Sequence, residues 1–454
     1  LDLYMPDYRP VSLRQQADPE GVALLDEIER HLETRLRQRK QGVAGVLEQL
    51  ADSLAIDRAA AQAVVHEYSM VVGATCQQAA GRQMANLKSV SNLDSTDIEF
   101  DTVVIDEAAR ANPLDLFVPM AMAKRRIVLV GDDRQLPHML EPDIEGQLQA
   151  EHQLTELQLA AFRSSLFERM RIKLQDLERQ DNIRRVVMLD TQFRMHPLLG
   201  DFISTQFYES QGLGRIRSGR DAADFVFSET FLAGLGPLAS HYRDRVCQWI
   251  DVPAGQGKEM RSGTSRVREV EALRIAEEVV RLLQAGGDSL SVGVITFYAA
   301  QRELIMEKLS EQRIDGVPLM VLRNGAYEPH EIFKWTRKVR GDGSVNSEER
   351  LRVGSVDAFQ GKEFDVVLLS CVRTYKPVTP GQGSEGDAER EKQLNRQFGF
   401  LRLPNRMNVA MSRQRQMLIC VGDSALATAP EAQEAVPALA AFHQMCGGEH
   451  GSLR

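Results

Sequence analysis

Short apolar runs alternate with longer amphipathic stretches along most of the chain. Polar residues or glycine bound four such apolar runs, Val103–Ile105, Ile127–Val130, Val292–Ile295 and Val366–Leu369. Runs of this kind are typical of strands that are buried on both faces of a parallel sheet. Residues 266–284 instead carry apolar side chains at helical spacing. The alternation of strands with helices predicts an α/β fold with mostly parallel sheets.

The first 68 residues have a different pattern and predict a helical hairpin. Asp18 followed by Pro19 is a typical helix start. Leu25, Ile28, Leu32 and Leu36 then repeat at helical spacing. A second amphipathic run covers residues 43–54. Two such helices in succession are expected to pair with each other.

Two of the apolar runs end in residues that suit phosphate chemistry. Asp106 and Glu107 follow the first run, and Gly131 to Gln135 follows the second. In open parallel sheets, ligands lie just beyond the carboxyl ends of the strands. One carboxylate could hold Mg²⁺, while the other orients or deprotonates an attacking water. The alternative is that both acids simply favour the dipole of a following helix.

A third segment makes the pattern specific. Three motifs occur in this order: Asp106-Glu-Ala-Ala109, Gly131-Asp-Asp-Arg-Gln-Leu-Pro137 and Gln192-Phe-Arg-Met-His-Pro197. They resemble motifs II, III and the following arginine motif of superfamily 1 helicases. Within that superfamily the resemblance is to the Upf-like group, which includes senataxin and Aquarius. Two later segments, residues 352–363 and 405–415, resemble motifs V and VI.

The resemblance implies two RecA-like lobes, the first of them incomplete. We expect a helical stalk or hairpin in residues 1–68 and a partial first lobe with motifs II and III in 69–184. Residues 185–425 would form the second lobe with motifs IV to VI and insertions, one of them within 322–350. Residues 426–454 would add a C-terminal helix and a tail.

The resemblance also implies that ATP and Mg²⁺ bind in a cleft between the lobes. Asp106 would hold Mg²⁺, with Glu107 and Gln135 acting on the attacking water. Arg194 and Arg413 would reach across from the second lobe and stabilise the transition state. Without the resemblance, Arg194 would be read as a structural salt bridge and Arg413 as a helix-surface charge.

Motif V implies a further nucleotide contact. Gly361 and Glu363 would meet the ribose or a phosphate. The alternative for Glu363 is a solvated carboxylate in a loop.

Single-stranded nucleic acid, DNA or RNA, is the partner that the resemblance implies, with movement from 5′ to 3′. The candidate contacts to the strand are Thr75, Pro137, Tyr298 and Ser355. Thr75 could equally bond the local backbone at a strand end. Phe297 stands where proline is common in the group, which leaves the contact at Tyr298 open.

One expected motif is missing from the 454 residues. A phosphate-binding loop needs Gly-x-x-x-x-Gly-Lys-Ser/Thr, and both Gly-Lys pairs, Gly257-Lys258 and Gly361-Lys362, are followed by Glu. We expect an upstream segment to supply this loop, and these residues alone to be inactive in ATP hydrolysis. The alternatives are a module that binds nucleic acid or a partner without hydrolysis, and a regulatory nucleotide switch.

Composition narrows the setting. The net charge of −9 predicts that any strand binding depends on local basic patches. The sequence has no run approaching about 20 apolar residues, so no membrane partner is expected. Five scattered cysteines without Cys-x-x-Cys spacing argue against a zinc site and a disulfide framework. A cytoplasmic location is therefore predicted.

Overall fold

The structure is a computed structural model that describes residues 19–39, 47, 51–52, 65, 68–79, 81, 100–136, 165–339, 345–376 and 386–454. The chain divides into two compact units, one of residues 1–103 and 117–127, the other of residues 104–116 and 128–454. The predicted lobe boundary at residue 185 stays a prediction. The division groups both predicted phosphate-facing segments with the larger sheet.

The first unit contains a helix at its start and a small apolar core. Helix α1 spans Pro19–Arg39, and Leu25 on its predicted apolar stripe is 65% exposed. The run expected to pair with α1, residues 43–54, lies almost wholly outside the described residues, so the hairpin stays a prediction. The core packs Ala79 of α4 (Cys76–Ala79) with Met122 and neighbouring apolar side chains.

Strands β1 (Phe100–Ile105) and β2 (Ala123–Leu129) form a two-stranded sheet that leads to the predicted acid pair. Helix α6 (Pro113–Met120) connects them. Both strands occur where the apolar runs predicted them, but Val104 is 63% exposed rather than buried. Within the described residues β1 has a single partner strand, which leaves part of its surface open.

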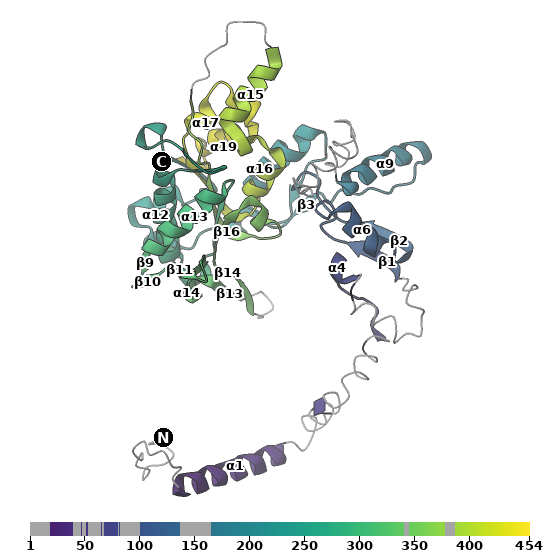
Figure 1. The fold of residues 1–454 in the computed structure, drawn as a ribbon, viewed down its shortest axis with the longest axis vertical. Coiled ribbons are helices and arrows are strands. Elements are labelled where there is room, and N and C mark those ends of the chain that lie inside the picture. Colours follow the sequence, from purple (N-terminus) through teal and green to yellow (C-terminus); the bar gives the residue numbers. More distant parts are fainter. Residues whose placement is uncertain are drawn as a thin grey trace. The chain divides into compact units, whose positions relative to one another are not determined.

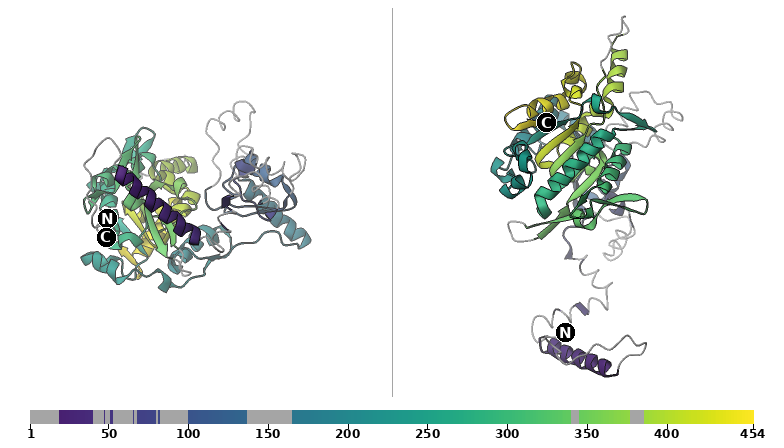
Figure 2. Two further views of the ribbon diagram at one scale, coloured as in Figure 1. Left: turned by 90° about the horizontal axis from the view of Figure 1, so that it is seen from below. Right: turned by 90° about the vertical axis from the view of Figure 1, so that its left-hand side faces the viewer.

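The second unit is built on a six-stranded parallel sheet with the order β15-β8-β16-β17-β5-β18. Its strands run side by side in the right-hand view of Figure 2. The strand bounds are β5 (Cys247–Asp251), β8 (Val292–Thr296), β15 (Leu351–Ser355), β16 (Phe364–Ser370), β17 (Gln414–Gly422) and β18 (Gly451–Leu453). Every residue of β8 and of β16 is buried, as their unbroken apolar runs predicted.

Helices cover both faces of this sheet, and each face has its own core (Figure 1). Val366 and Leu368 of β16 pack into one core, and the alternate residues Val367 and Leu369 pack into the other. Helix α12 (Glu269–Gly286) and helix α13 (Ala299–Glu311) contribute to the first core. The second core takes side chains from α10 (Pro197–Ile203), α16 (Pro404–Met411) and α19 (Pro437–Cys446). The α/β class with a parallel sheet is thereby confirmed.

Antiparallel hairpins follow α13 in the region expected as an insertion. The first two pair β9 (Arg313–Ile314) with β10 (Val317–Pro318), and β11 (Met320–Arg323) with β12 (Ala326–Pro329). Helix α14 (Glu331–Lys334) leads to a third, which pairs β13 (Trp335–Val339) with β14 (Val345–Glu349). This last hairpin, β13–β14, enters the edge strand β15 directly.

The remaining elements of the second unit are short, apart from two helices. Helix α9 (Leu166–Asp181) is capped by Ser165, whose hydroxyl accepts a hydrogen bond from the Glu168 amide at 3.0 Å. Helix α15 (Gly386–Phe398) is rich in Glu, Arg, Lys and Gln, which are good helix formers. The short helices are η1 (Ser204–Tyr208), η2 (Glu209–Gln211), η3 (Ala222–Phe225), α11 (Glu229–Gly234), η4 (Gly236–His241), η5 (Ala254–Gln256), η6 (Gly287–Ser289), η7 (Val356–Phe359), η8 (Gly399–Arg402), α17 (Ala425–Thr428) and α18 (Ala432–Ala435). The short strand pairs are β3 (Thr191–Gln192) with β4 (Arg217–Ser218), and β6 (Met260–Ser262) with β7 (Ser265–Val267).

The C-terminal residues correct one expectation. The sequence predicts a helix and a tail outside the second lobe for residues 426–454, but β18 is the edge strand of its sheet. The Asp251 amide donates to the Arg454 carbonyl at 2.7 Å, and the Arg454 amide donates to the Trp249 carbonyl at 2.9 Å. Backbone pairing with a buried strand is a tertiary contact that the small, polar sequence of this segment does not indicate.

A buried carboxylate, Glu271, ties the start of α12 to the end of β16. Arg268 donates to Glu271 at 3.3 Å, and both side chains are fully buried. Glu271 also accepts hydrogen bonds from the Ser370 hydroxyl and, at 2.8 Å, from the Val372 amide. Val372 has a φ of 65°, which is unusual for a β-branched residue. Burial raises the pKa of Glu271 to about 7.

Within the described residues, none of the helices combines the length and the apolar character that crossing a membrane requires.

Candidate functional site

The acid pair lies directly after β1. The Asp106 carboxylate accepts a hydrogen bond from the Glu107 amide at 2.9 Å, and both side chains are exposed. Glu107 has a φ of 54°, a left-handed conformation that is uncommon outside glycine. Its carboxylate accepts from the Gln360 amide group at 3.2 Å. The acid at the strand end therefore lies beside the loop that leads into Gly361.

The segment after β2 fixes the orientation of Gln135. Asp132 accepts from the Gln135 side-chain amide at 2.7 Å and from the Tyr208 hydroxyl. Burial, followed by the charge of Asp132, raises the pKa of Tyr208. At Gly131, a Cβ atom would lie 2.9 Å from the Ala109 amide nitrogen, so glycine lets this segment approach the residues after Glu107.

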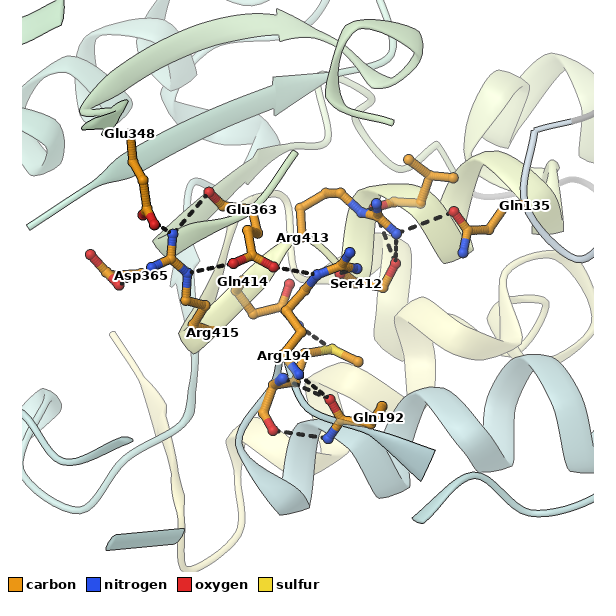
Figure 3. A network of polar contacts seen from close by, with 12 residues as sticks. Gln135, Gln192, Arg194, Glu348, Glu363, Asp365, Ser412, Arg413, Gln414 and Arg415 are labelled. Carbon is orange, nitrogen blue, oxygen red and sulfur yellow. Dashed lines mark hydrogen bonds and ion pairs between the residues drawn. The ribbon is translucent and has the colours of Figure 1, made fainter. Parts of the chain in front are cut away.

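Arg194 is held by its own turn and by two distant segments. Gln192 accepts from the backbone amides of Arg194 at 2.9 Å and of Met195 at 2.8 Å, which closes the turn before α10. The guanidinium donates through Nε to Glu363 at 3.0 Å and through Nη1 to the Ser412 carbonyl at 3.1 Å (Figure 3). In the part of the chain that the structure describes, its Nη2 donates no hydrogen bond and is the atom left for a ligand.

Arg413 is the most enclosed charge of the site. The residue is 1% exposed and donates to the Val409 carbonyl at 3.1 Å, the Ser412 hydroxyl at 2.7 Å and the Gln135 side-chain oxygen at 3.3 Å. Burial, and next the nearby charge of Arg194, lowers its pKa to about 9. Two positive charges this close to each other create a strong preference for an anion between or beside them.

Glu363 connects Arg194 to a further arginine. Its Oε2 meets Arg194, while its Oε1 lies 3.3 Å from Nε of Arg415. Gly361, two residues earlier, has a φ of 74°, a conformation that glycine adopts without strain. The structure thus brings Gln135, Arg194, Arg413 and Glu363 into one connected group of polar contacts, whereas Glu107 contacts Gln360 in the loop before Glu363.

The residues present fit Mg²⁺ bound with a nucleotide. Mg²⁺ is commonly held by one or two carboxylates together with substrate phosphates and water. The exposed Asp106 carboxylate, next to Glu107, offers that kind of ligand. Among the described residues, no group of three or more His, Cys, Asp or Glu side chains is arranged to hold a metal ion.

The four candidate strand contacts are not brought together in the same way. Thr75 belongs to the first unit, where its hydroxyl accepts from the Gln78 amide at 3.1 Å and caps α4. Pro137 lies outside the described residues. Ser355 ends β15, where its register partner is Thr296 of β8.

Tyr298 follows the same end of β8 but is 5% exposed. Its ring packs against Phe400 with a centroid distance of 5.4 Å, and its hydroxyl accepts from Arg373 at 3.4 Å. With the ring enclosed in this way, a base has no open face of Tyr298 to stack on. The strand-binding roles of all four residues stay predictions.

Sequence reasoning missed several residues that contact the site. Gln360 contacts Glu107, and Asn408 donates to the Arg134 carbonyl at 3.0 Å. Arg415 contacts Glu363, Asp365 and Glu348. Gln360 and Arg415 lie inside the segments that resemble motifs V and VI, and this position could have indicated that they belong to the site. Glu348 carried no signal because it lies in the expected insertion.

Acids after a strand end, a fixed glutamine and two arginines that both contact Ser412 occur here on a fold of the RecA-like α/β class. Two family models, each described as "AAA domain", match residues 12–140 and 162–425. The chain belongs to that family, and within it to the Upf1-like superfamily 1 helicases, as its motifs predicted.

Named relatives agree with this assignment. A "Regulator of nonsense transcripts 1 homolog" of Neurospora crassa is 28% identical over 353 residues, 78% of this chain and 24% of the relative. The "ATP-dependent helicase NAM7" of Saccharomyces cerevisiae is 27% identical over 72% of this chain and 26% of its own length. "Helicase sen1" of Schizosaccharomyces pombe is 26% identical over 72% of this chain and 15% of its own length. The chain thus spans about a quarter or less of these relatives.

Proposed function

We propose that the protein is an ATP-dependent helicase or translocase that uses Mg²⁺ and moves on single-stranded nucleic acid. The observation that carries the proposal is the contact between Gln135 and the buried Arg413, with Arg194 bonded to the adjacent Ser412 carbonyl. A glutamine that can orient the attacking water, with arginines that can meet the charge of the transferred phosphoryl group, is an arrangement that nucleotide hydrolases use. Names of relatives such as "ATP-dependent helicase NAM7" support the same activity.

Each residue then has a defined part in hydrolysis. Asp106 would hold Mg²⁺, which neutralises phosphate charge when it is bound. Glu107 accepts the proton of the attacking water, and Gln135 orients that water through its fixed amide group. Arg194 and Arg413 meet the charge that develops on the transferred phosphoryl group. Gly361 and Glu363, in the loop before β16, would contact the ribose or a phosphate.

The finer parts of the proposal concern the working cycle and its setting. The motif resemblance supports hydrolysis in a cleft between two lobes and movement from 5′ to 3′. It also supports strand contacts at Thr75, Pro137, Tyr298 and Ser355. An upstream segment with the phosphate-binding loop belongs to the same proposal. A cytoplasmic setting is supported by the free thiols of all five cysteines, four of them buried.

Substitution of Arg194 tests the function. In the full-length protein, Arg194→Ala should lower the kcat of strand-stimulated ATP hydrolysis by about a thousandfold, because the lost charge acts mainly on the transition state. The Kd for ATP, measured by titration, should change little. Arg220→Ala, which removes an exposed pair with Asp224, is the matched control and should leave kcat unchanged.

Two outcomes would reject the assignment. A weaker affinity for ATP with unchanged kcat would mean that Arg194 acts in ground-state binding. Absence of strand-stimulated hydrolysis in the full-length wild-type protein would instead favour a module that binds nucleic acid or a partner without hydrolysis.

A further inference from the structure

A chain of four charged side chains leads from the β13–β14 hairpin to Arg194. Glu348 of β14 bonds to Arg415, and Arg415 lies 3.3 Å from Oε1 of Glu363. The second oxygen of Glu363 accepts from Arg194 at 3.0 Å. The four residues come from four separate segments, and Figure 3 shows them in one continuous network.

Arg415 is the fixed member of this chain. Its side chain is 13% exposed and also lies 3.5 Å from Asp365. Asp365 is itself held, because its carboxylate accepts from the amide and hydroxyl of Ser291 at 2.9 and 2.8 Å. The Arg415 carbonyl accepts from the His196 amide at 2.8 Å, two residues after Arg194. Both the guanidinium and the backbone of Arg415 are therefore anchored.

Arg194 and Glu363 are less constrained. Their side chains are 31% and 43% exposed, and a solvent-exposed ion pair of that kind is weak in isolation. A carboxylate with one oxygen on Arg415 and the other on Arg194 has its rotation restricted at both ends. Removal of Arg415 would release Glu363, and Arg194 would lose a fixed partner for its Nε.

We infer that Arg415, held by Glu348, is a positioning residue that orients Arg194 through Glu363, so that the β13–β14 hairpin influences nucleotide turnover. The inference rests on the proposed function, because it concerns the arginine that stabilises the transition state there. Misplacing a charged group by about 1 Å can cost a large part of its catalytic effect.

The first test compares Arg415→Gln with Arg323→Gln in the full-length protein. Arg323 makes an exposed pair with Glu331 close to the same hairpin and is the control. Arg415→Gln should lower kcat about tenfold and change KM less than about twofold, and Glu348→Gln should lower kcat about threefold. The control should match wild type. Equal kcat in Arg415→Gln and the control would overturn the inference.

A double-mutant cycle separates positioning from general damage. In an Arg194→Ala background, measured by single turnover, Arg415→Gln should cause no further loss, because the residue through which it acts is gone. A further tenfold loss in that background would show that Arg415 acts independently of Arg194 and would overturn the inference.

A readout without catalysis keeps the two proposals distinguishable. The Nε–H resonance of Arg194, assigned by its disappearance in Arg194→Lys, should exchange with solvent faster in Arg415→Gln than in wild type. An unchanged exchange rate would overturn the inference. If the wild-type protein hydrolysed no ATP, the proposed function would fail, and this resonance would still decide whether Arg415 positions Arg194.

Discussion

At the scale of single residues, the site depends on how two arginines keep their charge in different surroundings. Arg413 is buried at the contact with Gln135, whereas Arg194 is partly open to solvent and held by Glu363. Arginine tolerates such burial because its ordinary pKa is far above neutrality. Even a pKa lowered to about 9 leaves Arg413 charged at neutral pH.

Lysine at the same position should behave differently. Lysine starts from a pKa of about 10.4, and the burial and repulsion that act on Arg413 would lower it towards neutrality. The charged fraction of a depressed lysine grows as pH falls, so kcat of Arg413→Lys should rise between about pH 8.5 and 6.5. Wild-type kcat should change little over this range.

The matched variant is Arg194→Lys, whose site is partly exposed and should leave the lysine charged. It should be impaired at every pH, because lysine lacks the planar fork that bonds both Glu363 and the Ser412 carbonyl. A flat profile for Arg413→Lys, parallel to that of Arg194→Lys, would contradict the role given to burial.

At the scale of elements, β16 connects the fold to the site. Glu363 and Asp365 lie at its start, and Ser370 and Val372 at its end are held by the buried Glu271 of α12. The ion pair of Glu271 with Arg268 has no exposure to solvent. The contribution of this pair to the free energy of unfolding therefore depends on whether Glu271 is protonated, because solvent screens the pair little.

Glu271 should make the stability of the protein depend on pH. The pKa of this carboxyl is about 7 when folded and has the ordinary value of 4.5 when unfolded. Between these values the folded state keeps a proton that the unfolded state has lost, so the free energy of unfolding should fall as pH rises from 4.5 to 7. Glu271→Gln should lack that fall, as measured by urea unfolding at several pH values.

Glu277→Gln on the same helix is the control, because Glu277 lies at the surface, where it pairs with Arg274. It should follow the wild-type curve. Parallel curves for wild type and Glu271→Gln would contradict the predicted proton uptake.

Local patterns predicted the elements well and the long-range contacts poorly. The run around Val366 indicated a strand because burial on both faces leaves an unbroken apolar signature. The runs around Ile105 and Ile127 also indicated strands, although both strands contain exposed residues in the structure. The pairing of Glu348 with Arg415 and the burial of Tyr298 beneath Phe400 could not be predicted. Both contacts depend on which segments meet across the sheet. The sequence around each of these residues does not indicate its partner.

At the scale of the whole molecule, the net charge of −9 governs any encounter with a strand. Like charges repel, so binding has to rely on local contacts to phosphates rather than on the overall field. Backbone contacts of this kind carry no sequence information. Weak and sequence-indifferent binding is therefore expected.

Salt titration of the full-length protein tests this expectation. With Z phosphates neutralised on a single strand, log affinity should fall with log salt at a slope of about −0.7Z. Homopolymers of different bases should bind with affinities within about tenfold of each other, since stacking energies differ little among bases. A slope near zero, or a strong preference for one base sequence, would exclude a backbone-based mode.

The strand order has a consequence for how this protein is synthesised. β5, the earliest of the six strands in the sequence, ends between the two latest, β17 and β18. Its edges cannot be covered until residues 414–453 have left the ribosome. At roughly 5–20 residues per second, the stretch from Asp251 to Gly451 takes about 10–40 s to make. During that interval the nascent chain carries an apolar strand with open edges, and we expect it to need a chaperone more than a protein with neighbouring strands in sequence order.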